Sequence, residues 1–225
     1  DPRMAMTIIY PGMDWNGTVV NTLDKTINGK DNANYPPSAN NASKTALTWR
    51  KYLDEQYANG IWNTNACPIV IRYAEVLLTY AEAVNELSGP SADVYDKLDL
   101  IRGRVGMPKV DREKYASKET LRRLIRRERG VELAGEGVRR ADILRWKDDN
   151  GKMVAETVLN GVLERVVGTV NYAETDPTKR AEIDTNAPAT DKKIEDRVFK
   201  VHNRYNPIPQ GAIDNNPNLE QNPGY

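Results

Sequence analysis

Apolar residues recur at helical spacing near the middle of the chain. One face of residues 69–87 carries Ile71, Ala74, Leu78, Ala81 and Asn85, with Leu77, Val84 and Leu87 beside it. Such a stripe is typical of a helix with one buried side. The pattern therefore predicts a helix over residues 69–87, which Ser88-Gly89-Pro90 ends.

A second helix follows with almost no linker. Ser91 is a suitable N-cap, and Gly106 and Pro108 close the segment. Its apolar residues, spaced four, three and four apart, are Val94, Leu98, Ile101 and Val105. Two helices joined so tightly form an αα-hairpin, the unit of tetratricopeptide-type solenoids. One hairpin does not demonstrate a repeat.

A third helix is expected over residues 118–134, with Ser117 as its cap. Glycines break it at 135–137, and a shorter helix follows around residues 138–148. Trp146 closes an apolar face of that helix and is expected in the core.

The chain before these helices is rich in turn-forming residues. Residues 1–45 are dominated by Asn, Gly, Pro and Asp, and residues 6–10 are apolar enough for a short strand. Pro11-Gly12 would end that strand as a turn. Loops of this length in compact domains are usually functional or disordered.

The chain after the helices is harder to interpret. Residues 153–170 fit either a helix or a hairpin turning at Asn160-Gly161. Residues 174–196 are polar and predict a mobile loop, and 197–201 alternate as a strand does. The Pro- and Asn-rich tail, 206–225, is expected to be extended and irregular.

The charge balance narrows the function classes. The 225 residues include 32 basic and 32 acidic side chains, so no surplus of positive charge favours nucleic acid. Cys67 is the single cysteine and His202 the single histidine, which excludes an intramolecular disulfide and gives little support to a Cys–His pair. No apolar run approaches the roughly 20 residues of a membrane span. No cofactor or metal is expected: the Asp and Asn residues between 24 and 34 fit no EF-hand loop.

The third predicted helix alternates arginine with glutamate. Glu128, Glu132 and Glu136 follow one another at four-residue spacing, and Arg139 comes next. We interpret this pattern as an ion-pair network that joins helices. A glycosidase carboxylate pair is the competing interpretation, but it requires two carboxyl groups roughly 5–10 Å apart across an open cleft.

The loops hold the candidate ligand-binding residues. Sugar binding uses aromatic faces with polar groups beside them. The candidates for a glycan are Trp15, Trp62, Tyr10, Tyr35, Asp14 and Asn16. The alternative for each is packing of the loop onto the helices, which we favour for Trp49.

Four stretches, in order and across nearly the whole chain, resemble the SusD/RagB family. The first is Asp1-Pro2-Arg3 before an apolar strand, and the second is residues 71–83 (IRYAEVLLTYAEA). The third lies within residues 101–146 and consists of Ile101-Arg102, Val105-Gly106-Met107-Pro108, Arg127-Glu128-Arg129, Glu132-Leu133, Glu136-Gly137-Val138-Arg139, Asp142 and Arg145-Trp146. The fourth is the tail from Pro207-Ile208-Pro209-Gln210 to Asn222-Pro223-Gly224-Tyr225. The chain departs from the family where aromatics are common, at Gly135, Arg140 and Ala141, and in the tail at Gly211-Ala212.

The resemblance implies a mainly α fold of tetratricopeptide-like hairpins with long irregular loops, a few short strands and an extended tail. Residues 1–225 would be the C-terminal SusD/RagB-like domain, loop-rich over 1–65, helical over 66–148 and irregular over 149–225. The N-terminal part of the full-length protein would be absent.

The resemblance also implies a function. Family members are lipid-anchored at the outer face of the Bacteroidetes outer membrane, where they work with a SusC-like TonB-dependent transporter. They capture glycans, or peptides in some branches, without catalysis. Two alternatives stay open: a scaffold that grips the transporter while the ligand binds elsewhere, and a glycan-degrading enzyme.

Overall fold

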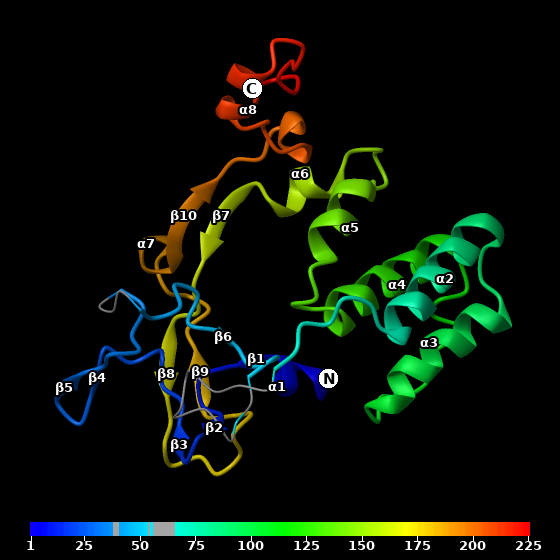
Figure 1. Ribbon diagram of the computed structural model, residues 1–225. Coiled ribbons are helices and arrows are strands. Elements are labelled where there is room, and N and C mark those ends of the chain that lie inside the picture. The colour runs from blue at the N-terminus through cyan, green and yellow to red at the C-terminus, as the bar shows by residue number, and fades with distance from the viewer. Residues whose placement is uncertain (38–40, 54, 56–65) are drawn as a thin grey trace.

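Three helices form the frame of the fold. The computed structural model of the chain describes residues 1–37, 41–53, 55 and 66–225. Helix α2 (Tyr73–Ser88) packs on α3 (Ala92–Arg104) and on α4 (Lys118–Glu132), and the three lie together on one side of the molecule (Figure 1). The fully buried side chains at their centre are Leu78, Val94, Leu98, Leu121 and Ile125. Each such side chain stabilises the fold by roughly 1.5–3 kcal/mol through burial.

The ends of these helices follow from local chemistry. The Ser91 hydroxyl accepts a hydrogen bond from the Val94 amide, and Ser117 forms a capping box with Thr120. Gly89 ends α2 with a φ of 79°, in the left-handed region that glycine adopts without strain. The predicted hairpin and its caps are therefore confirmed, although α2 begins at Tyr73 and not at residue 69, and ends at Ser88 and not at residue 87.

A second, smaller core lies beyond the glycine break. Gly135 and Gly137 turn the chain, and α5 (Arg139–Arg145) and α6 (Val154–Val158) follow. Trp146 is 4% exposed and packs with Ile143, Ala155 and Phe199, as the sequence predicts. None of the helices in the described part of the chain is long and apolar enough to cross a membrane.

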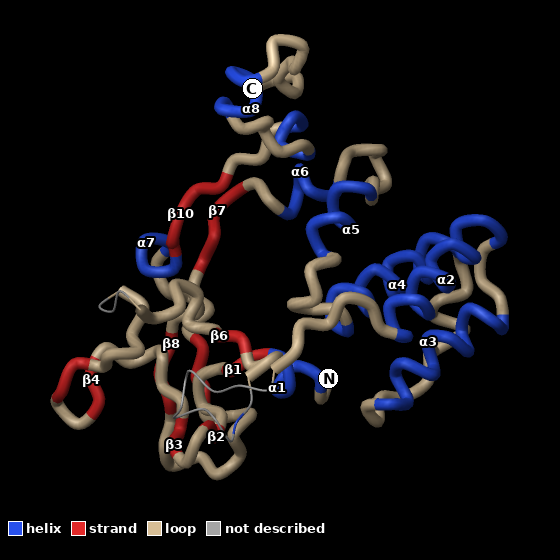
Figure 2. The backbone as a smooth tube through the Cα atoms, in the orientation of Figure 1, coloured by secondary structure: helices blue, strands red, loops and turns tan. Residues whose placement is uncertain are grey.

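The strands form five two-stranded antiparallel ribbons in the described part of the chain, and they gather on the side away from α2–α4 (Figure 2). The pairs are β1 (Ile8–Ile9) with β6 (Thr48–Trp49), β2 (Asp14–Trp15) with β3 (Thr18–Val19), β4 (Thr26–Ile27) with β5 (Lys30–Asp31), β7 (Gly161–Glu164) with β10 (Lys193–Arg197), and β8 (Gly168–Val170) with β9 (Ala181–Ile183). The remaining elements are α1 (Arg3–Thr7), α7 (Ala189–Lys192), a 3₁₀ helix over Val201–Arg204 and α8 (Gln210–Asn215). The expected fold class is confirmed, while its division at residues 65 and 148 stays a prediction.

The N-terminal strand is shorter than predicted. The first turn of α1 is tied by Asp1, whose carboxylate accepts hydrogen bonds from the Arg3 amide and guanidinium. The helix therefore takes up Met6 and Thr7, and β1 keeps only Ile8 and Ile9.

Neither interpretation of residues 153–170 is correct. The segment holds the short helix α6 and then β7, which pairs with β10 and not across an Asn160-Gly161 turn. The Asn160 side chain explains this, because it donates to the Phe199 carbonyl at 3.1 Å and accepts from the Phe199 amide at 2.6 Å. Long-range hydrogen bonds between Asn160 and Phe199 therefore take the place of the expected local turn.

Three further C-terminal predictions need correction. Residues 174–196 are not one loop, since they contain β9 and α7. The predicted strand over 197–201 is wrong because β10 ends at Arg197, and Phe199 turns into the small core. The tail includes the helical turn α8, and the Gln221 side chain holds both backbone groups of Ile208.

Candidate functional site

A tight hairpin presents Trp15 and Asp14. Strands β2 and β3 are joined by Asn16 and Gly17, with φ values of 48° and 76°. A two-residue turn that matches the twist of its two strands needs a positive φ at both residues, and Asn-Gly is the favoured sequence for it. The local sequence therefore fixes Asp14 and Trp15 beside an exposed turn.

Two arginines from distant parts of the chain hold this hairpin. The Arg50 guanidinium carbon lies 5.1 Å from the centre of the Trp15 ring, and Arg50 also donates to the Ala5 carbonyl at 2.7 Å. Arg180 donates to the Asp14 carboxylate at 2.7 Å. An indole and an exposed carboxylate thus lie beside the turn, each held by a guanidinium group that already donates to protein acceptors. An aromatic ring next to a polar group is suited to contact the face and hydroxyls of a sugar. We call these four residues the hairpin site.

The predicted ligand-binding residues fall into three groups. Tyr10, Asp14, Trp15 and Asn16 lie together in or next to the hairpin, and Tyr10 is half-buried, with its amide donating to the Met13 sulfur at 3.3 Å. Tyr35 follows a different hairpin, β4–β5, and lies 5.3 Å from the Arg165 guanidinium. Trp62 lies outside the described residues.

The Asp- and Asn-rich segment is held together by its own hydrogen bonds. The Asn21 side chain donates to the Asp24 carboxylate at 2.6 Å, and Asn32 donates to the Asp24 carbonyl at 2.8 Å. Asn21 and Asn32 are buried. These side chains therefore have a structural role in joining two loops.

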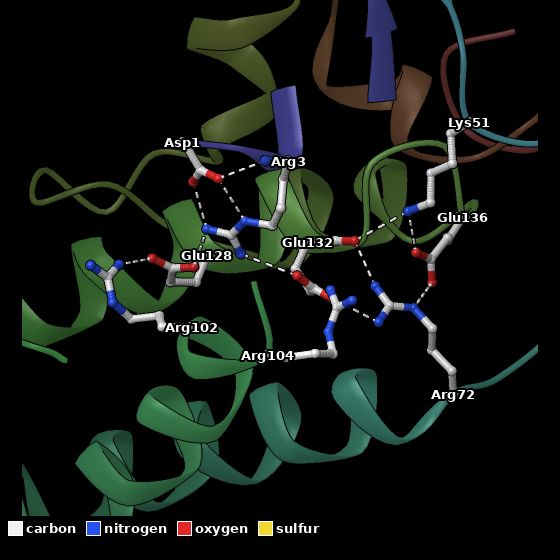
Figure 3. A network of polar contacts seen from close by, with 9 residues as sticks. All are labelled: Asp1, Arg3, Lys51, Arg72, Arg102, Arg104, Glu128, Glu132 and Glu136. Atoms are coloured by element: carbon white, nitrogen blue, oxygen red, sulfur yellow. Dashed lines mark hydrogen bonds and ion pairs between the residues drawn. The ribbon is translucent and has the colours of Figure 1, made fainter. Parts of the chain in front are cut away.

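Glu132, at the end of α4, is the centre of the ion-pair network (Figure 3). Its carboxylate is buried and meets Arg3 at 3.1 Å, Arg72 at 2.7 Å and Arg104 at 2.8 Å. These guanidinium groups come from α1, from the residue before α2 and from the end of α3. One carboxylate therefore joins four helices, and the predicted ion-pair network is confirmed.

The network continues on either side of Glu132. Glu128 pairs with Arg3 at 2.8 Å and with Arg102, and Glu136 pairs with Arg72 at 2.7 Å and with Lys51. Arg139, predicted to belong to this network, lies elsewhere: its guanidinium carbon is 5.7 Å from the Trp146 ring. The glycine turn at 135–137 rotates Arg139 away from the face that Glu128 and Glu132 occupy.

The electrostatics of these carboxylates oppose acid catalysis. Burial pushes the pKa of Glu132 upward, but hydrogen bonds from Arg72 and Arg3 and the charge of Arg104 outweigh it and hold the pKa below its ordinary value. Burial and the pairing of Glu136 with Arg72 and Lys51 compete in the same way, and its pKa is also lowered. A glycosidase acid needs a raised pKa.

The lowered pKa values predict an acid-sensitive fold. The unfolded chain binds protons on Glu132 and Glu136 at a higher pH than the folded chain does. These two groups therefore contribute their full stability above a pH of about 4.5, the ordinary pKa of glutamate. Their contribution falls as the pH drops toward the lower pKa values of the folded chain. We expect the thermal midpoint to decrease steadily below this pH, measured by circular dichroism. A Glu132→Gln variant should lose part of this pH dependence, and an unchanged dependence would contradict the assignment.

A second ion-pair cluster supports Trp146. Arg129 makes two hydrogen bonds to Asp142, at 2.9 and 3.0 Å. Arg145 pairs with Glu82, and the Trp146 indole nitrogen donates to the same Glu82 carboxylate at 2.7 Å. The cluster fixes α5 and Trp146 against α2 and α4.

Trp146 also lines a cleft of about 800 Å³. It is bounded by α4, the glycine break, α5 and β6, and the residues that define it here are Trp49, Trp146, Arg126, Arg127, Arg139 and Arg140. We call it the arginine cleft. Trp49 lies against Gly135, as expected for a packed loop, yet it remains 55% exposed. The expected packing of this loop onto the helices is therefore present, while Trp49 keeps exposed surface beside the cleft.

Sequence reasoning missed Arg50, Arg180 and the cleft. Arg180 is 166 residues from Asp14, and no local pattern connects them. The sequence contains the five arginines of α4, but it does not tell which of them pair with a carboxylate and which do not.

Comparisons with known proteins agree on one family. The model of the SusD family matches residues 1–225. The chain is 34% identical over 154 residues to SusD-like protein P25 of Formosa agariphila, covering 64% of this chain and 29% of that protein. It is 30% identical over 140 residues to SusD-like protein P2 of the same organism, covering 57% and 28%. The chain thus spans less than a third of these relatives.

Solved structures share the fold. A SusD-like protein from Bacteroides fragilis matches with a TM-score of 0.71 and 24% identity, over 100% of this chain and 38% of that one. A SusD homolog from Bacteroides thetaiotaomicron matches with a TM-score of 0.57 and 21% identity, over 100% and 41%.

Proposed function

Because the chain belongs to the SusD family, we propose that it is part of a non-catalytic glycan-binding protein of the outer cell surface. The full-length protein is lipid-anchored at the extracellular face of the outer membrane. It captures an oligosaccharide and passes it to a TonB-dependent transporter of the SusC type during nutrient uptake.

The hairpin site is the observation that carries this proposal. Trp15 offers an aromatic face, and the exposed Asp14 carboxylate, which Arg180 holds through one oxygen, offers a hydrogen-bonding group beside it. The site is held in place before any ligand arrives, because a two-residue turn and two distant arginines fix it. Pre-organised side chains lose little entropy on binding, which favours capture of a weakly interacting ligand.

The paired carboxylates support a role without catalysis. Each of four buried carboxylates already accepts hydrogen bonds from arginine or lysine side chains; these residues are Glu128, Glu132, Glu136 and Asp142. Hydrolysis of a glycoside needs one carboxylic acid that holds its proton near neutral pH. The lowered pKa values of Glu132 and Glu136 oppose that role.

The interaction scaffold is a second candidate, and the outer face of α2 favours it. Tyr73, Val76 and Tyr80 are exposed at helical spacing, and Leu87 is 85% exposed. An apolar stripe of this kind suits packing of another helix. A protein that copurifies with its transporter but binds no glycan would support this candidate over the first.

Affinity electrophoresis in gels that contain individual polysaccharides tests the hairpin site. We expect one or more polysaccharides to retard the full-length protein, and Trp15→Ala to weaken that binding by about thirtyfold, as for a central aromatic contact worth about 2 kcal/mol. Loss of the Arg50 contact should cost only about 0.5–1 kcal/mol of stability.

The matched control is Tyr73→Ala, which removes an exposed aromatic from α2. Its binding should equal that of the unchanged protein. Equal retardation of the Trp15→Ala variant would show that the glycan binds elsewhere.

A further inference from the structure

The arginines of α4 divide into two sets. Arg122 pairs with Glu86, Arg123 with Asp149 and Arg129 with Asp142. By contrast, no described carboxylate forms an ion pair with Arg126 or Arg127, nor with Arg139 and Arg140 of α5. All four unpaired residues line the arginine cleft. In a chain with equal numbers of acidic and basic residues, positive charge is therefore concentrated at one place.

The guanidinium groups of the cleft have spare hydrogen-bonding capacity. Arg126 donates to the Lys147 carbonyl at 2.9 Å, and its Nε has no acceptor among the described residues. Burial and the neighbouring charge of Arg122 lower the pKa of Arg126, in agreement with the absence of an ion pair to it among the described carboxylates. Arg140 has one hydrogen bond, to the Asn203 carbonyl at 3.1 Å. A guanidinium fork matches a carboxylate or sulfate group in shape and charge.

Aromatic rings, glycines and the aliphatic residues Val131, Ala134 and Val154 form the rest of the cleft lining. Trp49 is 55% exposed at one side, and Trp146 forms part of the wall, with the Arg126 and Arg139 guanidinium carbons 5.0 and 5.7 Å from its ring. Gly130, Gly135 and Gly137 contribute no side chains that would fill the space. A volume of about 800 Å³ lies within the range of small-molecule sites.

We propose that the arginine cleft binds negatively charged sugar units of an acidic glycan. The guanidinium groups take the carboxylate or sulfate, and Trp49 packs on the sugar ring. The inference rests on the proposed function for the ligand being a glycan, and it adds the charge class of that glycan. Uronate carboxylates and sulfate esters share this chemistry, and separate probes distinguish them.

The test is biolayer interferometry on the full-length protein with paired polysaccharides. Polygalacturonate is compared with its methyl ester, which lacks the carboxylate charge, and dextran sulfate with dextran. We expect the unchanged protein to bind at least one acidic member and to prefer it to its neutral partner. The Arg127→Gln/Arg139→Gln double variant should weaken that binding on the order of tenfold or more, because each lost charge-assisted hydrogen bond is large.

The control is Arg123→Gln, which removes an exposed arginine from the same helix but outside the cleft. It should change the affinity less than about twofold, since an exposed ion pair contributes little. Both variants should melt near the temperature of the unchanged protein, because Arg127 and Arg139 are exposed. Each single variant is measured too, so that binding can be judged if the double variant is unstable.

The other outcomes overturn the proposal. Equal loss in the Arg123→Gln variant would indicate unspecific attraction of polyanions. Binding of neutral polysaccharides alone would refute the acidic ligand and leave the proposed function in place. Binding of no polysaccharide would count against both, and would suit a cleft that an acidic protein segment covers in the full-length protein.

Discussion

Replacing Glu132 by glutamine is expected to lower the free energy of unfolding by about 3–5 kcal/mol, because it breaks a buried ion pair from one side. The substitution keeps the size of the side chain and removes only its charge. Three guanidinium groups, from Arg3, Arg72 and Arg104, would then face one another around a neutral group. Arg3 keeps its pairs with Asp1 and Glu128, but its side chain is only 5% exposed, so water cannot readily replace the Glu132 carboxylate.

Denaturant unfolding followed by circular dichroism measures this loss. The control is Glu119→Gln, on the exposed first turn of the same helix, where the charge acts mainly on the helix dipole and is worth at most about 1 kcal/mol. A loss below about 1 kcal/mol for Glu132→Gln would mean that the network is not what joins the helices.

Leu78→Ala is expected to destabilise the fold by about 2–5 kcal/mol, the range for emptying a packed leucine site. Leu78 is completely buried between α2 and its neighbours. Leu87 provides the matched comparison on the same helix, because it is 85% exposed. Leu87→Ala should change the stability by no more than about 0.5 kcal/mol.

Both values come from the same denaturant experiment. The difference between the stability losses of the Leu78→Ala and Leu87→Ala variants tests which face of α2 the fold buries. Similar losses for the two variants would show that Leu87 is also covered. That result would favour the scaffold function, in which another helix packs on this face.

Local chemistry explains why the helical frame was predictable. Ser91 and Ser117 are caps whose hydrogen bonds are made within three residues. Buried residues recur at helical spacing, as Leu78 and Ala81 do in α2 and Leu98 and Ile101 in α3. Such features depend on near neighbours in the chain. The same holds for the Asn16-Gly17 turn that presents Trp15, since the dihedral angles of the turn select its residues.

Long-range contacts explain what was missed. Asn160-Gly161 has the sequence of a hairpin turn, but Asn160 binds Phe199, which is 39 residues away. Arg50 and Arg180 reach the hairpin site from other segments, and nothing in their surroundings marks them. The same holds for the arginine cleft. The packing of α2 and α5 on α4 decides which arginines of α4 form an ion pair with a carboxylate and which remain unpaired.

The fold assigns separate roles to its charged and aromatic residues. Glu128, Glu132 and Glu136 bind arginines and a lysine and hold the helices together. The surfaces that we propose for a ligand, the hairpin site and the arginine cleft, each place a tryptophan beside arginine. This separation supports the proposed capture of glycans without cleavage.

Isothermal titration calorimetry of the full-length protein with a panel of polysaccharides tests this account most directly. For at least one polysaccharide, we predict heat that saturates at a fixed stoichiometry and returns to the baseline after each injection. Heat flow that continues after an injection would reveal turnover of the glycan, and the absence of heat with every polysaccharide would deny binding. Either result would contradict capture of a glycan without catalysis.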